Sequence, residues 1–237
     1  MKNSLPDTIV LAGGLGTRLQ SVIKNTPKPM ANIAGKPFLY WLLNYISNYN
    51  PSKIILSTGY LSDSIEEFFG NNFNNIPIIY SVEDAPLGTG GAIKKALGYC
   101  NSNNCMVING DTFFKIDFYE LLKFHTEQNS DFTISLKEIE NPVRYGTVEL
   151  TGFDITRFRE KNQELKRGFI NAGIYLFKKS ISGFLPNEEK FSFEKDFLET
   201  SLNKLKFKGM ISNGNFIDIG IPEDYKKAND EFYEIFN

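Results

Sequence analysis

The chain has 237 residues, of which 41% are hydrophobic and 23% are charged, and its 26 basic and 28 acidic side chains leave a formal net charge of −2. This balance is typical of a globular protein that buries a substantial core without crosslinks. The near-neutral charge excludes a general nucleic-acid coat and a membrane-surface binder, which need a basic excess, but it allows an anionic ligand in one local pocket.

The first half of the chain alternates strand-like and helix-like segments. Short apolar, β-branched runs predict strands, and bulky apolar residues at helical spacing predict helices. In chain order, we expect strands at Thr8–Ala12, Lys53–Thr58, Ile76–Val82, Cys105–Asn109 and Asp131–Lys137, and helices at Pro37–Ser47, Ser62–Phe69 (capped by Ser62), Gly88–Tyr99 and Asp117–Asn129. The alternation predicts an α/β fold with a mostly parallel, mixed central sheet and helices on both faces.

After Asn141 the expected strands are shorter and are mixed with helices. They are Gly146–Leu150, Phe169–Phe177, Lys206–Ile211 and Phe216–Ile219, with helices at Phe193–Leu205 and Pro222–Phe236. No Pro- or Ser-rich linker, repeat or low-complexity tract separates the two halves. We therefore expect a single domain over residues 1–237 with two lobes, at about 1–140 and 141–237.

Three loops follow predicted strands of the first half: Gly13–Arg18, Glu83–Gly91 and Gly110–Phe113. Ligands of such sheets bind outside the carboxyl ends of the strands. We therefore expect these loops to gather at one edge of the sheet.

The first loop has the composition of an anion-binding site. It places Gly13, Gly14 and Gly16 in four residues and follows them with Thr17 and Arg18. Without Cβ atoms, consecutive N–H groups can form a nest around phosphate oxygens, and a guanidinium adds a fork of donors. Neither a dinucleotide fingerprint nor a P-loop matches the spacing, because Leu19 stands where a third glycine is needed and no Lys-Ser/Thr pair follows. The alternative is a glycine turn beside a surface arginine.

Two further segments are ambiguous when taken alone. Pro27 and Pro29 restrict the backbone around Lys28, so this lysine is expected on a stiff, extended segment where it could meet a polyphosphate; a solvated lysine is the alternative. The Gly-rich turn Pro86–Ala92 could bring backbone close to a nucleobase, or could only pack a helix N-terminus tightly.

Two aspartates end predicted apolar strands. Asp111 follows Asn109-Gly110, and Asp218 lies in Phe216–Gly220. Mg²⁺ prefers oxygen ligands and is commonly held by one or two carboxylates together with substrate phosphates, so these two aspartates are the candidate metal ligands. Asp117 and Asp224 stand at the starts of predicted helices, where aspartate acts as a cap.

Cysteine and histidine are too scarce for chemistry that depends on them. Cys100, Cys105 and His125 cannot supply the four ligands of a structural zinc site. We expect His125 to be a surface or partly buried helix residue, and the thiols to be free. The N-terminus lacks a signal-peptide pattern, and no stretch approaches about 20 apolar residues, so we expect a cytoplasmic location and no membrane partner.

Taken together, these segments resemble the sugar-1-phosphate nucleotidyltransferase family. The matching stretches occur in the family's order: Ala12–Leu19, Pro27–Met30, Pro86–Gly90, Asn109–Asp111, Arg144–Thr147, Asn171–Tyr175, Asp218–Gly220 and Pro222–Tyr225. The resemblance implies a Rossmann-like nucleotidyltransferase fold and a reaction in which an NTP and a sugar 1-phosphate give an NDP-sugar and pyrophosphate.

The resemblance also implies roles for individual residues. Arg18 and Lys28 would act on the phosphates at the reacting centre, and Asp111 and Asp218 would hold Mg²⁺. The implied nucleotide-binding residues are Leu11, Gly13, Gly14, Gly16, Thr17, Glu83, Gly88 and Gly110. The implied sugar-phosphate-binding residues are Gly146, Glu160, Lys161 and Asn171, of which Glu160-Lys161 is the shorter match.

Within the family, the segment Phe216–Tyr225 and Ala85 before Pro86 are most similar to the branch that transfers a guanylyl group from GTP to D-glycero-α-D-manno-heptose 1-phosphate. That branch makes a GDP-heptose for bacterial surface glycans. The alternatives are a uridylyl-, thymidylyl- or cytidylyltransferase acting on a hexose 1-phosphate, and a non-catalytic homologue that binds nucleotide sugars. A nicotinamide-dependent oxidoreductase is disfavoured by the missing third glycine, and homo-oligomerisation is left open.

Overall fold

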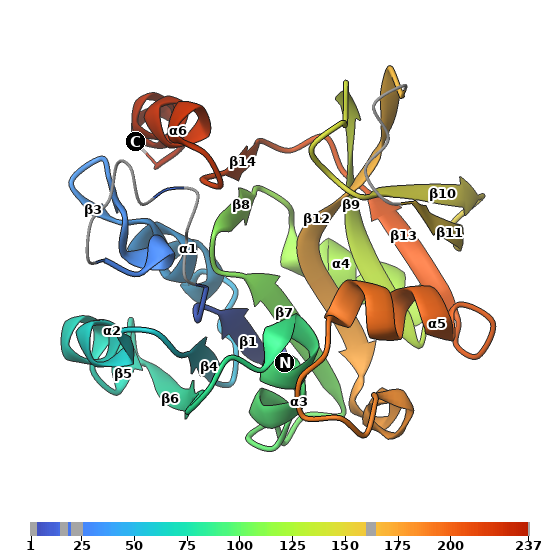
Figure 1. The fold of residues 1–237 in the computed structure, drawn as a ribbon, viewed down its shortest axis with the longest axis horizontal. Helices are drawn as coiled ribbons and strands as arrows, with labels where there is room; N and C mark the ends of the chain where they lie inside the picture. Colours follow the sequence, from blue (N-terminus) through green and yellow to red (C-terminus); the bar gives the residue numbers. More distant parts are fainter. Residues whose placement is uncertain (1–3, 15–18, 20–25, 160–164, 237) are drawn as a thin grey trace.

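The structure, a computed structural model, describes residues 4–14, 19, 26–159 and 165–236. A ten-stranded sheet runs through the whole molecule in the order β10-β11-β13-β9-β12-β7-β1-β4-β6-β5 (Figure 1). Helices lie against both of its faces, so the expected α/β architecture with a mixed central sheet is confirmed.

The parallel part of the sheet is built by the first half of the chain. β1 (Asp7–Leu11) lies between β4 (Ile54–Thr58) and β7 (Asn104–Asn109), and β6 (Ile76–Val82) extends the sheet beyond β4. These four strands are parallel, so their carboxyl ends meet at one edge. The short β5 (Asn72–Phe73) pairs antiparallel with β6.

The rest of the sheet is more antiparallel than the sequence indicates. β12 (Arg167–Lys178) pairs antiparallel with both β7 and β9 (Phe132–Glu140), and it thereby joins the two halves of the chain in one sheet. β10 (Thr147–Thr151) and β11 (Asp154–Arg159) form an antiparallel hairpin, whereas β13 (Phe207–Ile211) runs parallel to β9.

Each face of the sheet has its own apolar core, because alternate strand residues point to opposite faces. Val10 belongs to the core that packs on α1 (Phe38–Ser47), α2 (Ser62–Phe69), α4 (Phe118–Glu127) and α6 (Pro222–Phe236). Its neighbour Ile9 belongs to the opposite core, with α3 (Gly88–Leu97), the turn η3 (Lys179–Phe184) and the π-helix η4 (Phe193–Leu198). The short α5 (Glu199–Ser201) directly follows η4.

Two small ribbons shape the edge above the parallel strands. β8 (Thr112–Phe114) pairs antiparallel with β14 (Phe216–Asp218), and β2 (Asn32–Ile33) pairs with β3 (Lys36–Pro37). The first ribbon aligns Asp218 with Thr112, the residue after Asp111. It therefore brings together two segments that are more than 100 residues apart in the sequence.

Some local predictions need correction. Asp117 caps α4 by accepting from Tyr119 N and Glu120 N, as expected, but Ser62 is the first residue of α2 and Leu61 precedes it in the cap position. Residues 193–205 form a π-helix and a short α-helix instead of one regular helix. Asp224 lies in the first turn of α6, where its carboxylate pairs with Arg144 at 2.8 Å.

His125 is more buried than the sequence suggests. It is only 2% exposed, and its Nδ1 lies 2.7 Å from Thr133 Oγ1. Cys100 and Cys105 are buried free thiols, as expected.

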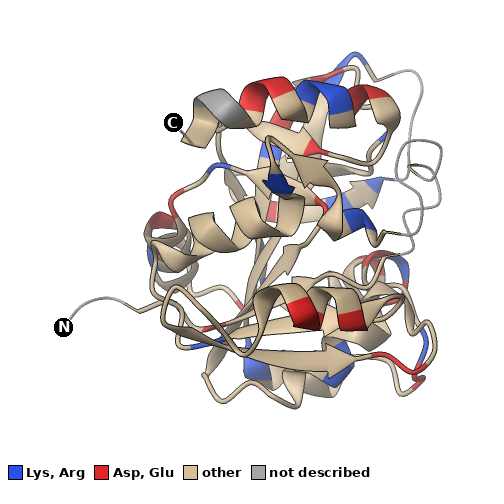
Figure 2. Cartoon of the chain, turned by 90° about the vertical axis from the view of Figure 1, so that its left-hand side faces the viewer, with Lys and Arg blue, Asp and Glu red and all other residues tan. Residues whose placement is uncertain are grey.

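The charged residues are of both signs, in keeping with the formal net charge of −2. Acidic and basic segments are interspersed on the side of the molecule that Figure 2 presents. Among the helices described, none has the length and apolar character needed to span a bilayer.

Candidate active site

A cavity of about 690 Å³ opens at the carboxyl ends of the parallel strands. Leu11, Ser57 and Asn109 line it from β1, β4 and β7, where register pairs Leu11 with both other residues. Gly13, Gly14, Glu83 and Gly88 line it from the loops that follow β1 and β6. The described parts of these loops therefore gather at one edge of the sheet, as expected, together with Asp111 from the loop after β7.

Lys28 and Asp111 close one end of this cavity. Lys28 Nζ lies 2.6 Å from Asp111 Oδ2 and 3.6 Å from Asp218 Oδ1. The two candidate metal ligands thus converge on one ammonium group. Lys28 itself is only 8% exposed, which rules out a solvated lysine.

The local backbone explains how Lys28 reaches this position. Pro27 is extended, and Lys28 begins the one-turn 3₁₀ helix η2 (Lys28–Met30), with Pro29 as its second residue. Proline fixes φ near the value that such a turn needs and lacks the N–H that the first turn leaves unbonded. The expected stiffness is present, but Lys28 lies at the start of a helical turn and not on an extended segment.

Asp218 is fixed by the ribbon of β8 and β14. Ile219 N donates to the carbonyl oxygen of Asp111 at 3.2 Å, so the two aspartates are held together through the backbone. Burial raises the pKa of Asp218, with Asp111 and Asp224 adding repulsion, while Lys28 lowers it. A second cation would relieve this repulsion, which is the condition that a divalent metal site satisfies.

The donor set fits Mg²⁺ when substrate phosphates complete it. Among the described residues, no group of three or more His, Cys, Asp or Glu side chains could enclose an ion. Asp111 and Asp218 supply hard oxygen ligands, and Mg²⁺ usually retains water or phosphate oxygens beside one or two carboxylates.

The glycines of the site allow backbone segments to pack closely, as well as allowing a ligand to approach the backbone. A Cβ on Gly110 would lie 2.5 Å from the carbonyl oxygen of Leu11, so only glycine fits where β7 passes β1. Gly88 has φ +71°, and a Cβ there would lie 2.6 Å from the Phe191 carbonyl oxygen. The turn before α3 is therefore packed tightly, one of the two readings its sequence allows, while Gly88 also faces the cavity.

Glu83 presents a carboxylate to the same cavity. Its Oε2 accepts a hydrogen bond from Leu87 N at 2.9 Å. Burial raises the pKa of Glu83, whereas the bond from Leu87 and the charge of Lys95 lower it. The side chain is thus a fixed hydrogen-bond acceptor beside Gly13, where an added Cβ would lie 3.0 Å from Glu83 Oε1.

Asn171 lies on β12 at a bulge against β9. Its Nδ2 donates to Tyr175 Oη at 2.8 Å, and its Oδ1 accepts from Gly173 N at 3.0 Å. Gly173 has φ +75°, and a Cβ there would lie 2.7 Å from Asn109 Nδ2. The bulge therefore packs directly on the end of β7, next to the cavity.

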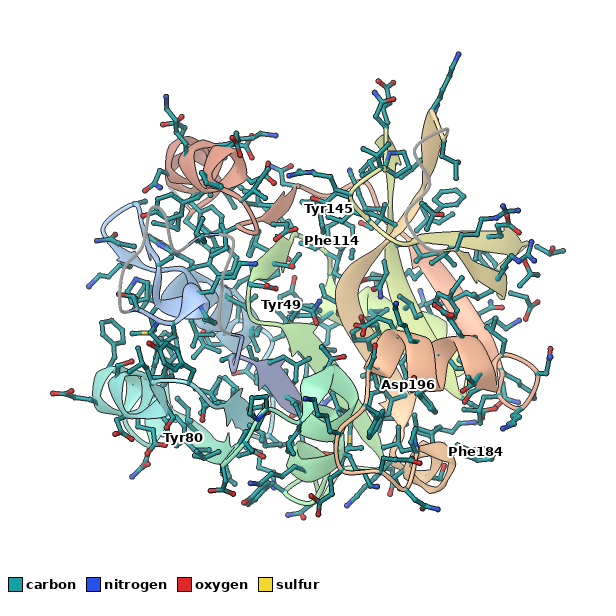
Figure 3. All side chains as sticks on the ribbon, in the orientation of Figure 1. Tyr49, Tyr80, Phe114, Tyr145, Phe184 and Asp196 are labelled. Carbon is teal, nitrogen blue, oxygen red and sulfur yellow. The ribbon has the colours of Figure 1, made fainter. Side chains whose placement is uncertain are left out.

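Gly146 lies in an exposed turn before β10, beside Arg144 and Tyr145. The ring centroids of Tyr145 and Phe216 lie 5.8 Å apart, and those of Phe216 and Phe114 lie 5.9 Å apart. Tyr145 and Phe114 are labelled in Figure 3. Burial, and next the charge of Asp218, raises the pKa of Tyr145 to about 12. The turn that contains Gly146 therefore lies close to Asp218.

Five predicted site residues lie outside the described residues: Gly16, Thr17, Arg18, Glu160 and Lys161. The sequence reasoning also missed the contribution of β4, since Ser57, Gly59 and Tyr60 line the cavity. The same rule about carboxyl ends of parallel strands would have found them, because Gly59 directly follows the predicted strand Lys53–Thr58.

Comparisons with known proteins agree on one family. The model of the family described as "Nucleotidyl transferase" matches residues 7–234. The D-glycero-alpha-D-manno-heptose 1-phosphate guanylyltransferase of Aneurinibacillus thermoaerophilus is 46% identical over 225 residues, which cover 95% of this chain and 97% of that protein. The enzyme of the same name from Campylobacter jejuni is 45% identical over 217 residues, covering 92% and 96%.

Solved structures show the same similarity. The crystal structure of HddC from Yersinia pseudotuberculosis superposes with a TM-score of 0.85 at 40% identity, covering 96% of this chain and 100% of that one. A second structure of HddC, complexed with GMP-PN, superposes with a TM-score of 0.84.

Proposed function

This chain belongs to the nucleotidyl transferase family, and we propose that it transfers the guanylyl group of GTP to D-glycero-α-D-manno-heptose 1-phosphate, with release of pyrophosphate. Membership confirms the resemblance inferred from the motifs and the fold expected from it. The observation that carries the proposal is the 45–46% identity to two guanylyltransferases of this specificity over more than nine-tenths of every chain compared.

The reaction needs charge neutralisation and alignment more than acid–base chemistry. A phosphate oxygen of the sugar 1-phosphate attacks the α-phosphorus of GTP, the bond from that phosphorus to the bridging oxygen breaks, and pyrophosphate leaves with the electron pair. The attacking oxygen is already ionised, so no histidine is required. In this proposal Lys28 and Arg18 stabilise the charge that develops on the leaving pyrophosphate.

The remaining nucleotide contacts of this proposal are those that the resemblance implies. The N–H groups of Gly13, Gly14, Gly16 and Thr17 bind the triphosphate, and Leu11, Gly88 and Gly110 border the nucleoside. Asp111 and Asp218 would hold Mg²⁺, which supplies charge neutralisation between the phosphates. The convergence of both carboxylates on Lys28 Nζ supports this assignment.

In this proposal Glu83 favours guanine over the pyrimidine bases. Guanine presents two adjacent donors, N1–H and N2–H₂, on its Watson–Crick edge, and an ionised carboxylate is a pair of acceptors. Uracil and thymine present a single donor flanked by two carbonyl oxygens, which a carboxylate repels. The acceptor at Glu83 therefore supports GTP over a pyrimidine nucleotide.

For the second substrate, Gly146, Glu160, Lys161 and Asn171 bind the sugar 1-phosphate in this proposal. Two observations support this assignment: Gly173, close to Asn171, packs on the cavity-lining Asn109, and Tyr145, next to Gly146, is near enough to Asp218 for its charge to raise the tyrosine pKa. The product, a GDP-heptose, would serve synthesis of a surface glycan, and the enzyme would work in the cytoplasm.

A matrix of nucleotides against sugar 1-phosphates tests this proposal. The purified chain is incubated with Mg²⁺, one of GTP, ATP, UTP, dTTP or CTP, and heptose, mannose or glucose 1-phosphate, and pyrophosphate release is followed. We expect the highest kcat/KM for GTP with the heptose 1-phosphate. Preference for a pyrimidine nucleotide would overturn the guanylyl assignment, and absence of turnover with every pair would leave a non-catalytic homologue.

A further inference from the structure

Glu194, in the first turn of η4, reaches across to the turn that begins α3. Its Oε2 accepts hydrogen bonds from Thr89 Oγ1 at 2.9 Å and from Ser192 Oγ at 3.1 Å. Thr89 Oγ1 in turn accepts from Phe193 N at 2.9 Å, and Thr89 lines the cavity. A carboxylate that no sequence motif singled out is therefore held one side chain away from the site.

The carboxylate is not needed to hold these two segments together. Gly90 N donates to the Phe191 carbonyl oxygen and Phe191 N donates to the Leu87 carbonyl oxygen, both at 3.0 Å. A Cβ on Gly91 would lie 2.0 Å from the Glu189 carbonyl oxygen, so the backbones already touch. Packing and backbone bonds already fix the contact, so the two hydrogen bonds to Glu194 Oε2 add to it without being its sole support.

Tyr175 connects Glu194 with Asn171. Tyr175 is fully buried, and its pKa is raised by burial and next by the charge of Glu194, with Asp111 adding to the effect. Asn171 donates to the same Tyr175 hydroxyl. The Tyr175 ring packs on Phe193, the residue before Glu194, with 5.5 Å between ring centroids. Glu194 therefore lies near Asn171, one of the residues proposed to bind the sugar 1-phosphate.

The local helix geometry supports a role at a site. Phe193–Leu198 is a π-helix, a rare form that is frequently found at functional sites. Both hydroxyl donors bond to Oε2, and no hydrogen bond from a described residue reaches Oε1. One carboxylate oxygen is therefore held in place while the other keeps its acceptor capacity.

We propose that Glu194 is a specificity-determining residue that accepts hydrogen bonds from hydroxyl groups of the sugar 1-phosphate. A carboxylate repels the phosphate end of that substrate. Its partner is therefore the neutral polyol end, whose hydroxyl groups donate hydrogen bonds to the carboxylate. This inference rests on the proposed function, since it assigns a contact within the same reaction.

Steady-state kinetics of Glu194→Ala and Glu194→Gln test the proposal. Loss of a hydrogen bond to a charged acceptor corresponds to a change of about tenfold or more. We expect the KM for the sugar 1-phosphate to rise by about that factor in Glu194→Ala, with the KM for GTP within about twofold of the wild type. Glu194→Gln, which keeps one acceptor oxygen, should recover part of the loss.

Glu188→Gln is the matched control, because it removes one negative charge from an exposed side chain of the segment that precedes η4. It should leave both KM values unchanged. The proposal is overturned if the sugar-phosphate KM of both Glu194 variants equals that of the wild type. It is also overturned if both KM values rise together with a lower melting temperature, which indicates a structural role.

The two levels of the argument fail separately. If the wild type turns over and both Glu194 variants keep the wild-type KM for the sugar 1-phosphate, this inference fails and the proposed function stands. Absence of wild-type turnover with every nucleotide and sugar 1-phosphate removes both.

Discussion

Lys28 Nζ lies 2.6 Å from Asp111 Oδ2, and the same ammonium group lies 3.6 Å from Asp218 Oδ1. One buried cation therefore offsets the repulsion between two carboxylates that the fold brings together. A divalent ion bound by the same two aspartates would compete with Lys28 for them, and would free the lysine to contact phosphate oxygens. The three residues are thus best understood as one electrostatic unit.

Lys28→Met should lower kcat, and in metal-free buffer it should also lower the unfolding free energy. Loss of a positioned charge at the reacting phosphates costs about 100-fold in kcat, and two uncompensated carboxylates cost about 1–3 kcal/mol of unfolding free energy. Because Mg²⁺ can replace the missing positive charge, it should restore stability in the variant more than in the wild type. Urea unfolding with and without Mg²⁺, together with pyrophosphate release, measures these effects.

The control for this variant is Lys115→Met, which removes an exposed lysine that follows β8. It should leave the unfolding free energy within about 0.5 kcal/mol of the wild type. Equal stability of Lys28→Met and wild type in metal-free buffer would show that the close approach to the aspartates contributes nothing.

Glycines at two positions of the site should respond differently to alanine. A Cβ on Gly91 would lie 2.0 Å from the Glu189 carbonyl oxygen, whereas one on Gly14 would have no described atom within 4 Å. Gly91→Ala should therefore lose at least about 2 kcal/mol of unfolding free energy through overpacking. Gly14→Ala should keep its stability but raise the KM for GTP, because the new methyl group stands where the triphosphate approaches the backbone.

Chemical denaturation and nucleotide kinetics of both variants separate the two effects. A stable Gly14→Ala enzyme with an unchanged KM for GTP would remove Gly14 from the phosphate-binding loop.

Glu83→Gln should weaken the preference for GTP. The glutamine amide offers one donor and one acceptor, so it pairs poorly with the two donors of guanine and better with a pyrimidine edge. We expect the ratio of kcat/KM for GTP to that for UTP to fall by about tenfold or more. The glutamine carbonyl can still accept from Leu87 N, so the loop should stay folded.

Glu67→Gln, at an exposed position on α2, removes the same charge away from the cavity and serves as the control. An unchanged GTP-to-UTP ratio in Glu83→Gln would assign base recognition to other groups.

The sequence predicts the first half of the fold well, because each strand there is a compact apolar run that ends at a glycine or a polar turn. It also predicts that Asp111 and Asp218 lie at the sheet edge, since a carboxylate at the end of a buried strand has a clear position there. The contact of both with Lys28 could not be predicted, because it depends on the pairing of β8 with β14, strands of only three residues.

Three other features could not be predicted from the sequence, for physical reasons. Residues 87–91 pack tightly on residues 189–191 through backbone contacts between distant segments. No sequence motif marks such a contact, so the position of Glu194 beside the site could not be predicted. The π-helix has the apolar spacing of an α-helix in sequence. The burial of His125 depends on its packing against β9, where Thr133 Oγ1 lies 2.7 Å from His125 Nδ1.

His125 should make the protein less stable in mild acid. Burial, and next the charge of Lys178, lowers the pKa of His125 from 6.5 to about 4, while Asp131 opposes this shift. Between these two values the unfolded chain binds a proton that the folded chain excludes. The unfolding free energy should therefore be unaffected above pH 6.5 and should fall by about 3 kcal/mol as the pH drops towards 4, at 1.36 kcal/mol per unit.

Comparison of wild type with His125→Asn isolates this contribution. The asparagine side chain can still bond to Thr133 Oγ1 but does not titrate, so its unfolding free energy should change less than that of the wild type between pH 6.5 and 4.5. Buried carboxylates affect both proteins equally and cancel in the difference. Urea unfolding at half-unit intervals of pH measures it, and parallel curves for the two proteins would mean that the imidazole takes up its proton equally well in the folded state. Because His125 lies outside the cavity, the variant should retain wild-type kcat/KM at pH 7.5, which separates its role in stability from the chemistry of the site.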